Sequence, residues 1–385
     1  MEFKTRREMN LKFTEMMNDV YESRLEEKKQ NFGQNMIKSY LVEGHVNKDL
    51  DCHEHETQKT AHDDFNRFFK ENIKKLDYNL NIFDTEEEHF FKLEIEDVVF
   101  YLDAVKDQRF WMIHTPYKTE DVDKRINKFI DSFSHFDKIW LTNNLMNNTQ
   151  KYTTWNSISL KHDEPSKIEE EQQEQENISF KIGRASQSKI LKLMDMLDQS
   201  EDFRYSTGIC RLSVKVHSKY SDRPVIDDIK YDGKFSTRGS DFNDHLWLIN
   251  KIYSNYKEQV INVEDNFSLS YNKKRLEGLP INIKFSRRDL DVHFLIKYIF
   301  SGTNPFKLWG FPKELSKGYY KILGLDLHKG NLGNKINFEM TSEFIRIYLP
   351  KGNCGNTIAR LISNIQRHID SKIKVWGGDE ENELF

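Results

Sequence analysis

Residues 90–133 read FFKLEIEDVVFYLDAVKDQRFWMIHTPYKTEDVDKRINKFIDSF, and this stretch decides the fold class. Three apolar runs rich in β-branched and aromatic residues predict strands over 90–95, 98–105 and 110–114. Thr119 is a suitable helix N-cap, and Glu120 and Asp121 suit a first helical turn. One apolar stripe then predicts a helix through Val122, Ile126, Phe129, Ile130 and Phe133. With a further strand over 138–142, the pattern indicates an α+β sheet covered by helix on one face.

The same alternation of strand and helix signals returns in the second half of the chain. Helices are predicted to begin at Ser186 and Asp241, and another is expected over 356–370. Strands are predicted over 180–182, 209–217, 281–285, 319–327, 335–340, 344–349 and 372–376. We therefore expect two α+β domains with mixed or antiparallel sheets.

Changes in composition suggest where the parts of the chain divide. The start is highly charged with apolar residues at helical spacing, so we expect a helical arm over 1–45. An α+β domain would follow over 46–162. Residues 163–177 are acidic, rich in Glu and Gln and free of aromatic residues, as in a linker. The second α+β domain would then occupy 178–385.

The net charge of −4 hides an asymmetry between the two parts. Residues 178–385 hold 33 Lys and Arg against 25 Asp and Glu, a net charge of +8, whereas residues 1–177 carry −12. A basic domain beside an acidic part points to a polyanionic partner or to contact between the two. Uneven surface decoration is the alternative.

Cysteine content and hydropathy bear on location and cofactors. Three widely spaced cysteines, no signal-like N-terminus and no long apolar run suggest a cytoplasmic protein with no membrane contact. A weak candidate metal cluster combines one thiol with three imidazoles, at Cys52, His53, His55 and His62. Its spacing matches no common zinc pattern, so we expect a polar loop there and no cofactor.

The junction between a strand and a helix at 344–370 is the first candidate site. Its Gly-containing turn could present backbone N–H groups and Lys351 to an anion at a helix N-terminus. If the helix buries its isoleucines, its polar side chains would continue this site along an outer face. The candidate phosphate-binding residues are Lys351, Gly352, Asn353, Gly355, Asn356, Arg360, Asn364 and Arg367. A tight turn followed by an ordinary amphipathic helix explains the pattern equally well.

A second basic cluster lies next to aromatic residues, a combination that suits a nucleic-acid strand. Its members are Lys273, Lys274, Arg275, Lys284, Arg287 and Arg288, flanked by Tyr271 and Phe285. A solvated charged turn is the alternative.

Catalytic signatures are weak. Arg288 and His293 fit the Arg-x₄-His spacing of HEPN-type ribonucleases, although those enzymes carry it in a helical bundle. Asp326 and His328 end an apolar strand, where a catalytic edge or a simple turn could lie. The common Ser-hydrolase, zinc-protease, dinucleotide and kinase motifs are absent from the sequence.

Together these features favour an accessory subunit of a larger complex that binds nucleic acid, DNA or RNA, through its basic C-terminal domain. The N-terminal arm would contact a protein partner. A nuclease or nucleotide-processing enzyme, and a scaffold protein without nucleic-acid contact, remain alternatives.

Overall fold

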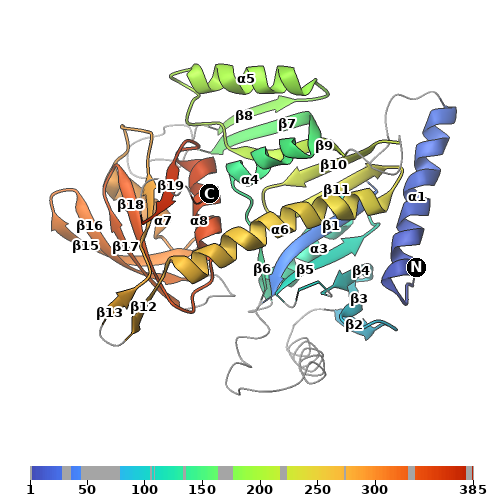
Figure 1. Cartoon of the computed structure of the whole chain (residues 1–385), viewed down its shortest axis with the longest axis horizontal. Coiled ribbons are helices and arrows are strands. Elements are labelled where there is room, and N and C mark those ends of the chain that lie inside the picture. The colour runs from blue at the N-terminus through green and yellow to red at the C-terminus, as the bar shows by residue number, and fades with distance from the viewer. Residues whose placement is uncertain are drawn as a thin grey trace. The chain divides into compact units, whose positions relative to one another are not determined.

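A computed structural model describes residues 2–27, 36–44, 79–104, 106–107, 109–132, 136–163, 177–216, 223–272, 275–327, 334–378 and 384 (Figure 1). Helices and predominantly antiparallel sheets alternate along these residues, which confirms the α+β prediction with two domains. Within the described residues, no helix combines the length and the apolar run needed to cross a membrane.

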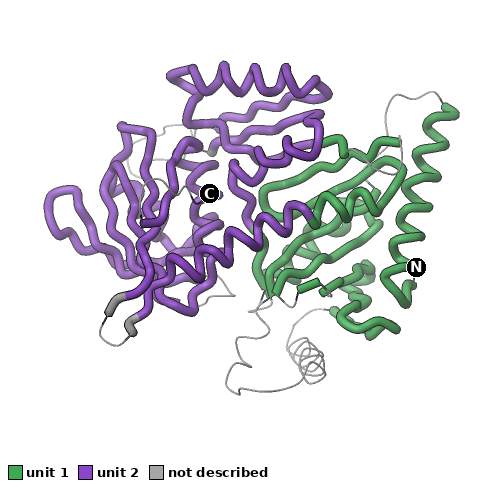
Figure 2. Tube along the Cα trace, in the orientation of Figure 1, with its two compact units in different colours: residues 1–139, 214–250 green, residues 140–213, 251–385 purple. Residues whose placement is uncertain are grey.

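The chain forms two compact units, each assembled from separate stretches of sequence (Figure 2). Unit 1 consists of residues 1–139 and 214–250, and unit 2 of residues 140–213 and 251–385. This division differs from the expected linear one, because 140–162 belong to unit 2 and 214–250 to unit 1. The borders fall inside strand β9 (Ile209–Val216) and helix α6 (Phe242–Asn266), where composition gives no signal.

Unit 1 is built on an antiparallel sheet in the order β2-β3-β4-β5-β1-β11-β10, with β6 paired to β1. The strands are β1 (Ile37–Gly44), β2 (Leu80–Asp84), β3 (Phe90–Ile95), β4 (Val98–Asp103), β5 (Phe110–Thr115), β6 (Phe136–Lys138), β10 (Val225–Lys230) and β11 (Lys234–Gly239). The strands expected at 90–95, 98–105 and 110–114 are confirmed.

The expected helical arm over 1–45 is wrong beyond residue 36, because β1 is a central and fully buried strand. Lys38, Ser39 and Glu43 interrupt its apolar pattern and conceal it in the sequence. Gly44 ends β1 where any side chain would collide with the ring of Trp111.

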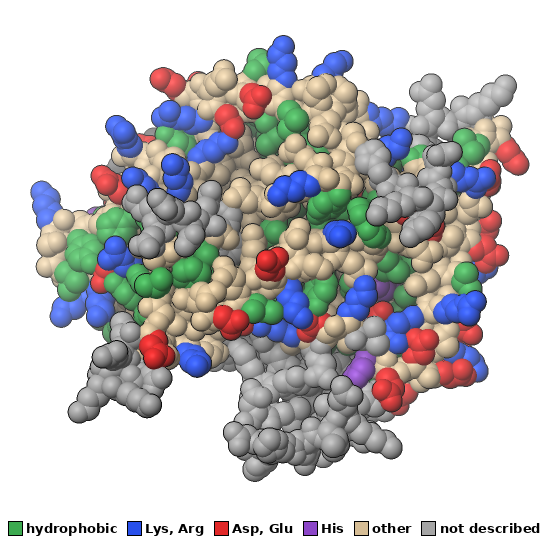
Figure 3. All heavy atoms as spheres, in the orientation of Figure 1, with side chains coloured by type: hydrophobic (Ala, Val, Ile, Leu, Met, Phe, Trp, Pro, Cys, Tyr) green, Lys and Arg blue, Asp and Glu red, His purple; other side chains and the backbone are tan. Residues whose placement is uncertain are grey.

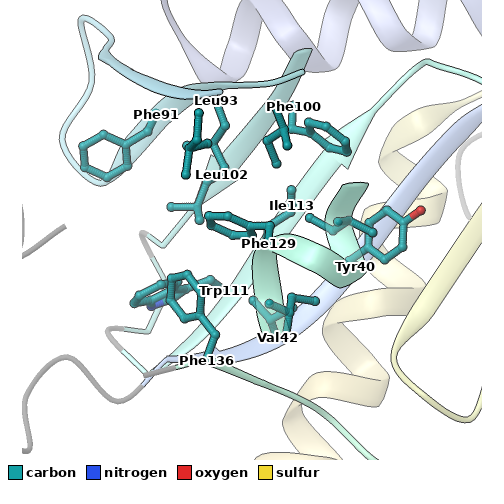
Figure 4. Close-up of a cluster of buried hydrophobic side chains, with 14 of the residues drawn as sticks. Tyr40, Val42, Phe91, Leu93, Phe100, Leu102, Trp111, Ile113, Phe129 and Phe136 are labelled. Carbon is teal, nitrogen blue, oxygen red and sulfur yellow. The ribbon is translucent and has the colours of Figure 1, made fainter. Parts of the chain in front are cut away.

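Helix α3 (Thr119–Ser132) covers one face of this sheet as its apolar stripe predicts. Figure 4 shows Phe129 reaching between Leu102, Ile113 and Trp111 of the sheet. Phe136 meets Trp111 edge to face, with ring centroids 4.8 Å apart. This cluster is the core of the α3 side of unit 1.

Helix α1 (Arg6–Glu26) packs within unit 1 through its apolar side. Its buried residues are Met9, Phe13, Met17 and Tyr21. Phe13 packs edge to face on Phe242, the first residue of α6, with ring centroids 5.0 Å apart. The apolar stripe that made the arm a candidate for partner contact is therefore used inside the protein.

Unit 2 contains a second sheet, in which β15-β16-β17-β18-β14-β19 are consecutive antiparallel neighbours. These strands are β14 (Ile281–Lys284), β15 (Leu308–Ser316), β16 (Tyr319–Asp326), β17 (Asn334–Met340), β18 (Phe344–Pro350) and β19 (Lys374–Gly377). The pair β12 (Ser268–Asn272) and β13 (Arg275–Glu277) joins through β12 and β18, and β7 (Thr153–Asp163) pairs with β8 (Asn177–Ile182). The helices are α4 (Asn143–Asn148), α5 (Gln187–Gln199), α7 (Val292–Ile299) and α8 (Asn356–His368).

Candidate nucleic-acid interface

The six-stranded part of the unit 2 sheet has one buried face and one solvent-facing face. Burial alternates residue by residue along β16, β17 and β18, because successive side chains of a strand point to opposite faces. On the buried side, Asp326 of β16 bonds to Thr357 and Arg360 of α8, so α8 covers that side.

We call the other side the open face. It consists of Trp309, Phe311, Lys313, Tyr319, Lys321, Leu323, Leu325, Lys335, Asn337, Glu339, Phe344, Arg346, Tyr348, Asn282, Lys284, Lys374 and Trp376. In Figure 3, hydrophobic side chains lie among Lys and Arg side chains at the left of the view, over β15 and β16.

Basic side chains dominate the charge of the open face. Lys313 lies opposite Lys321 across β15 and β16. Like charges at directly opposed positions destabilise a sheet, so folding alone does not favour this pair. The remaining cations are Lys284, Lys335, Arg346 and Lys374. The carboxylate of this face is that of Glu339, opposite Lys321 and Arg346, so the open face carries a clear excess of positive charge.

Arg346 is held in place at the centre of the open face. Its Nε donates to Asn282 Oδ1 at 2.9 Å, and its Nη1 lies 3.7 Å from Glu339 Oε2. The guanidinium lies 5.9 Å from the centroid of the Phe344 ring. The side chain remains 43% exposed, so its charge is oriented but still available to a ligand.

Apolar and aromatic side chains lie between these cations. Phe311 is 64% exposed and faces Leu323, which is 55% exposed. A hydrogen bond to Glu339 raises the pKa of Tyr319, and burial raises the pKa of Tyr348. Both phenols therefore stay neutral at physiological pH and add no negative charge. The exposed rings of Trp309 and Phe311 offer flat surfaces on which bases can stack.

In the predicted anion-binding turn, a carboxylate of the protein itself accepts a hydrogen bond at the helix N-terminus. Gly352 has a left-handed φ of 88° and, like Lys351, is exposed. However, the backbone N–H of Gly355 donates to Glu264 Oε1 at 2.6 Å, so a carboxylate of α6 already caps α8. The side chain of Asn353 is also used, donating to the carbonyl of Pro350 at 2.9 Å.

The expected outer face of α8 is wrong, because the helix is buried on all sides. Arg360 is 1% exposed and pairs with Asp326 at 2.5 Å. Arg367 donates to three carbonyl oxygens, those of Ser363, Leu141 and Ile209. Asn364 donates to the carbonyl of Pro305 at 3.1 Å, and Asn356 accepts from the hydroxyl of Tyr256. These side chains hold unit 2 together and cannot reach a ligand in solution.

The weak catalytic candidates are not brought together. Asp326 is fully buried on the covered side of the sheet, and its pairing with Arg360 and Thr357 contradicts a catalytic edge there. The Tyr320 hydroxyl lies 3.3 Å from His293 Nε2, and His293 lines a cavity of about 410 Å³. Arg288 lines a different cavity, of about 440 Å³.

Three members of the second basic cluster have described side chains: Lys284, which lies on the open face, and Arg287 and Arg288. Arg287 and Arg288 line the larger cavity with Arg204 and Tyr205, and both Arg204 and Arg287 lie over the Tyr205 ring. Arg287 is paired with Asp289 at 2.7 Å. The other positions lie outside the described residues or have side chains that do: His328, Lys273, Lys274, Arg275, Cys52, His53, His55 and His62.

The sequence predicts most strands of the open face, but it does not show that their outward residues form one surface. Alternate positions of 319–327, 335–340 and 344–349 already carry Lys, Arg and aromatic side chains. Reading those positions together would have identified the surface, had the strand order been known. The strand β15 was missed because Gly310 and Pro312 interrupt it.

The comparison with known proteins concerns the whole chain. A family model described as "MJECL33-like protein" matches residues 1–384. A protein of Methanocaldococcus jannaschii named "Uncharacterized protein MJECL33" is 28% identical over 391 residues, covering 92% of this chain and 90% of that protein. Neither name states an activity, a ligand or a partner.

Proposed function

The chain belongs to the MJECL33-like protein family, and we propose that it binds single-stranded nucleic acid across the open face of unit 2. The observation that carries this proposal is the interleaving of exposed cations and exposed rings on one sheet face. Cations follow the phosphates of a strand, while rings stack on its bases without reading sequence. In this role the protein is an accessory component of a larger cytoplasmic complex.

A single strand fits the open face better than a duplex does. The surface is a broad sheet, and the bases of a duplex are already stacked on one another. Unpaired bases can instead lie flat on Phe311 or Trp309 while their phosphates meet Lys313 and Lys321. Recognition through phosphates and base faces is common to DNA and RNA.

The first experiment removes cations from the open face. The triple variant Lys313→Ala, Lys321→Ala, Arg346→Ala should weaken the binding of short labelled poly-dT and poly-rU strands, measured by fluorescence anisotropy at low salt. Its control removes the same residue types from an exposed part of unit 2, as Lys181→Ala, Lys189→Ala and Arg184→Ala. Equal losses in both triples would contradict a localised interface.

The second experiment tests the stacking surface. Phe311→Ala should cost about 1–3 kcal/mol of binding free energy, the range for one base stacked on an aromatic ring. Met196→Ala is the control, because Met196 is similarly exposed, at 59%, but lies on α5. Unchanged affinity in Phe311→Ala would remove stacking from the proposal and leave only electrostatic contact.

A further inference from the structure

Unit 1 contains a chain of hydrogen bonds between four buried polar side chains that the proposed function does not use. Ser39 Oγ lies 2.8 Å from His245 Nε2, and His245 Nδ1 lies 2.6 Å from Asp227 Oδ1. On its other side, Ser39 Oγ lies 2.7 Å from His114 Nδ1. The order nucleophile, base and orienting carboxylate is that of a Ser-His-Asp centre.

The sheet and α6 bring these residues together. Ser39 of β1 lies directly opposite His114 of β5 in the antiparallel register. Asp227 of β10 is opposite Thr237 of β11, which in turn is opposite Ile37 of β1. Strands β1, β5 and β10 therefore present Ser39, His114 and Asp227 on one face of the sheet. His245 reaches them from the first turn of α6. Four segments distant in sequence meet here, so no local motif marks the centre.

The three hydrogen bonds allow an arrangement in which the serine proton lies toward His245. Burial lowers the pKa of His114 to about 3, so this imidazole is neutral and its Nδ1–H can donate to Ser39 Oγ. The Ser39 hydroxyl proton then points to His245 Nε2, while His245 Nδ1–H donates to the Asp227 carboxylate. In this arrangement His245 is the acceptor for the serine proton, as a general base must be.

The cluster also lowers the stability of the fold more than a fully hydrogen-bonded structural network would. His114 Nε2, Asp227 Oδ2 and Thr237 Oγ1 are buried and have no hydrogen-bond partner. Each unpartnered buried polar atom costs about 1–3 kcal/mol, and proteins keep such costs mainly where function requires them.

We propose that Ser39 is the nucleophile of a second, hydrolytic site in unit 1, with His245 as general base and Asp227 as the residue that positions it. The substrate class is a small carboxylic ester. Ser39 Oγ forms a bond to the carbonyl carbon and gives its proton to His245 Nε2. The ester C–O bond breaks, and the departing alcohol takes that proton. Water then attacks the acyl carbon and gives a proton to His245 Nε2. The bond between that carbon and Ser39 Oγ breaks, His245 returns the proton to Ser39 Oγ, and the acid leaves.

Access to this centre depends on α1. Phe242 covers both imidazoles, with ring centroids 5.6 Å from His114 and 5.4 Å from His245. Phe13 of α1 packs on Phe242, and Thr14 Oγ1 accepts from the Phe242 backbone N–H at 3.2 Å. Ser39 is 1% exposed, so a substrate can enter only when α1 and Phe242 move away together.

The test uses a fluorophosphonate probe on the full-length protein, with adducts located by mass spectrometry. Ser39 Oγ would bond to phosphorus as the P–F bond breaks, so fluoride leaves and the proton goes to His245. We expect a slow adduct on Ser39 and none in Ser39→Ala. Thr14→Val removes the hydrogen bonds of Thr14 Oγ1 to the Phe242 N–H and to Asp241 Oδ1 with little change in volume. It should raise the labelling rate about 5- to 30-fold, the effect of one to two hydrogen bonds worth ~1 kcal/mol each.

Variants of the other two residues separate chemistry from folding. His245→Gln should abolish labelling. Asp227→Asn should slow it by ~10³- to 10⁴-fold and shift its pH profile, whereas Asp227→Glu should recover part of the rate. Circular dichroism checks that each variant is folded. The proposal is overturned if Ser39 forms no adduct in either the parent or Thr14→Val, or if labelling is unchanged in folded His245→Gln.

Discussion

At the scale of single residues, the arginines of unit 2 divide into two kinds that the sequence does not distinguish. A helical period separates the isoleucines of α8 from Arg360, Asn364 and Arg367. The period cannot reveal that the polar side is also covered by protein. That depends on partners such as Asp326 and Leu141, which are far away in sequence.

The pairing of Arg360 with Asp326 leads to a stability prediction. Arg360→Ala leaves the buried Asp326 carboxylate without its counter-charge, and this should lower the free energy of unfolding by about 3–5 kcal/mol in urea denaturation. Lys313→Ala, on the open face, should change it by less than about 0.5 kcal/mol. If the two variants were equally stable, the assignment of Arg360 to a structural role would be wrong.

His114 makes stability depend on pH. Burial, with the charge of His245 as the second cause, lowers its pKa from 6.5 to about 3 in the folded protein. The unfolded chain therefore binds a proton at higher pH than the folded one does. The stabilising contribution is complete above pH 6.5 and is lost progressively as the pH falls toward 3. In His114→Gln, the free energy of unfolding should fall less steeply over this window, and an unchanged slope would contradict a buried neutral imidazole.

At the scale of elements, the predictions succeeded where burial repeats regularly. Helix α3 has a clear stripe, and the strands β16, β17 and β18 alternate cleanly, so each was found in sequence. The strands β1 and β15 were missed because polar residues, Gly or Pro break their patterns. The polar residues of β1 make buried contacts: Glu43 pairs with Arg109, and Ser39 bonds to His114 and His245.

The N-terminus of α8 gives a prediction for an element. The carboxylate of Glu264 caps this helix at Gly355, in the position where an anionic ligand was expected. Glu264→Ala should cost about 0.5–2 kcal/mol of unfolding free energy, as for other N-terminal caps. Added inorganic phosphate should restore part of the melting temperature in this variant but not in the parent. A parent protein that phosphate stabilises as strongly would show instead that the turn binds anions on its own.

At the scale of the whole molecule, composition correctly indicated an α+β protein with two compact parts. The partition was not predictable, because each unit combines separate segments and a linear scan finds only linear borders. The basic excess after residue 178 directs attention to the C-terminal part. Some of this charge is neutralised in buried contacts such as that of Arg360, and the cations of the open face become a surface only when six strands are aligned.

The dependence of binding on salt tests the central claim most directly, because each phosphate contact with a single strand contributes about −0.7 to the slope of log K against log salt. We expect a linear, negative slope for the parent protein with poly-dT or poly-rU. The slope should become shallower by about 2 in the variant lacking Lys313, Lys321 and Arg346, and should not change in the variant lacking Lys181, Arg184 and Lys189. Binding that is absent, that does not depend on salt, or that has the same slope in all three proteins would contradict a nucleic-acid interface on the open face.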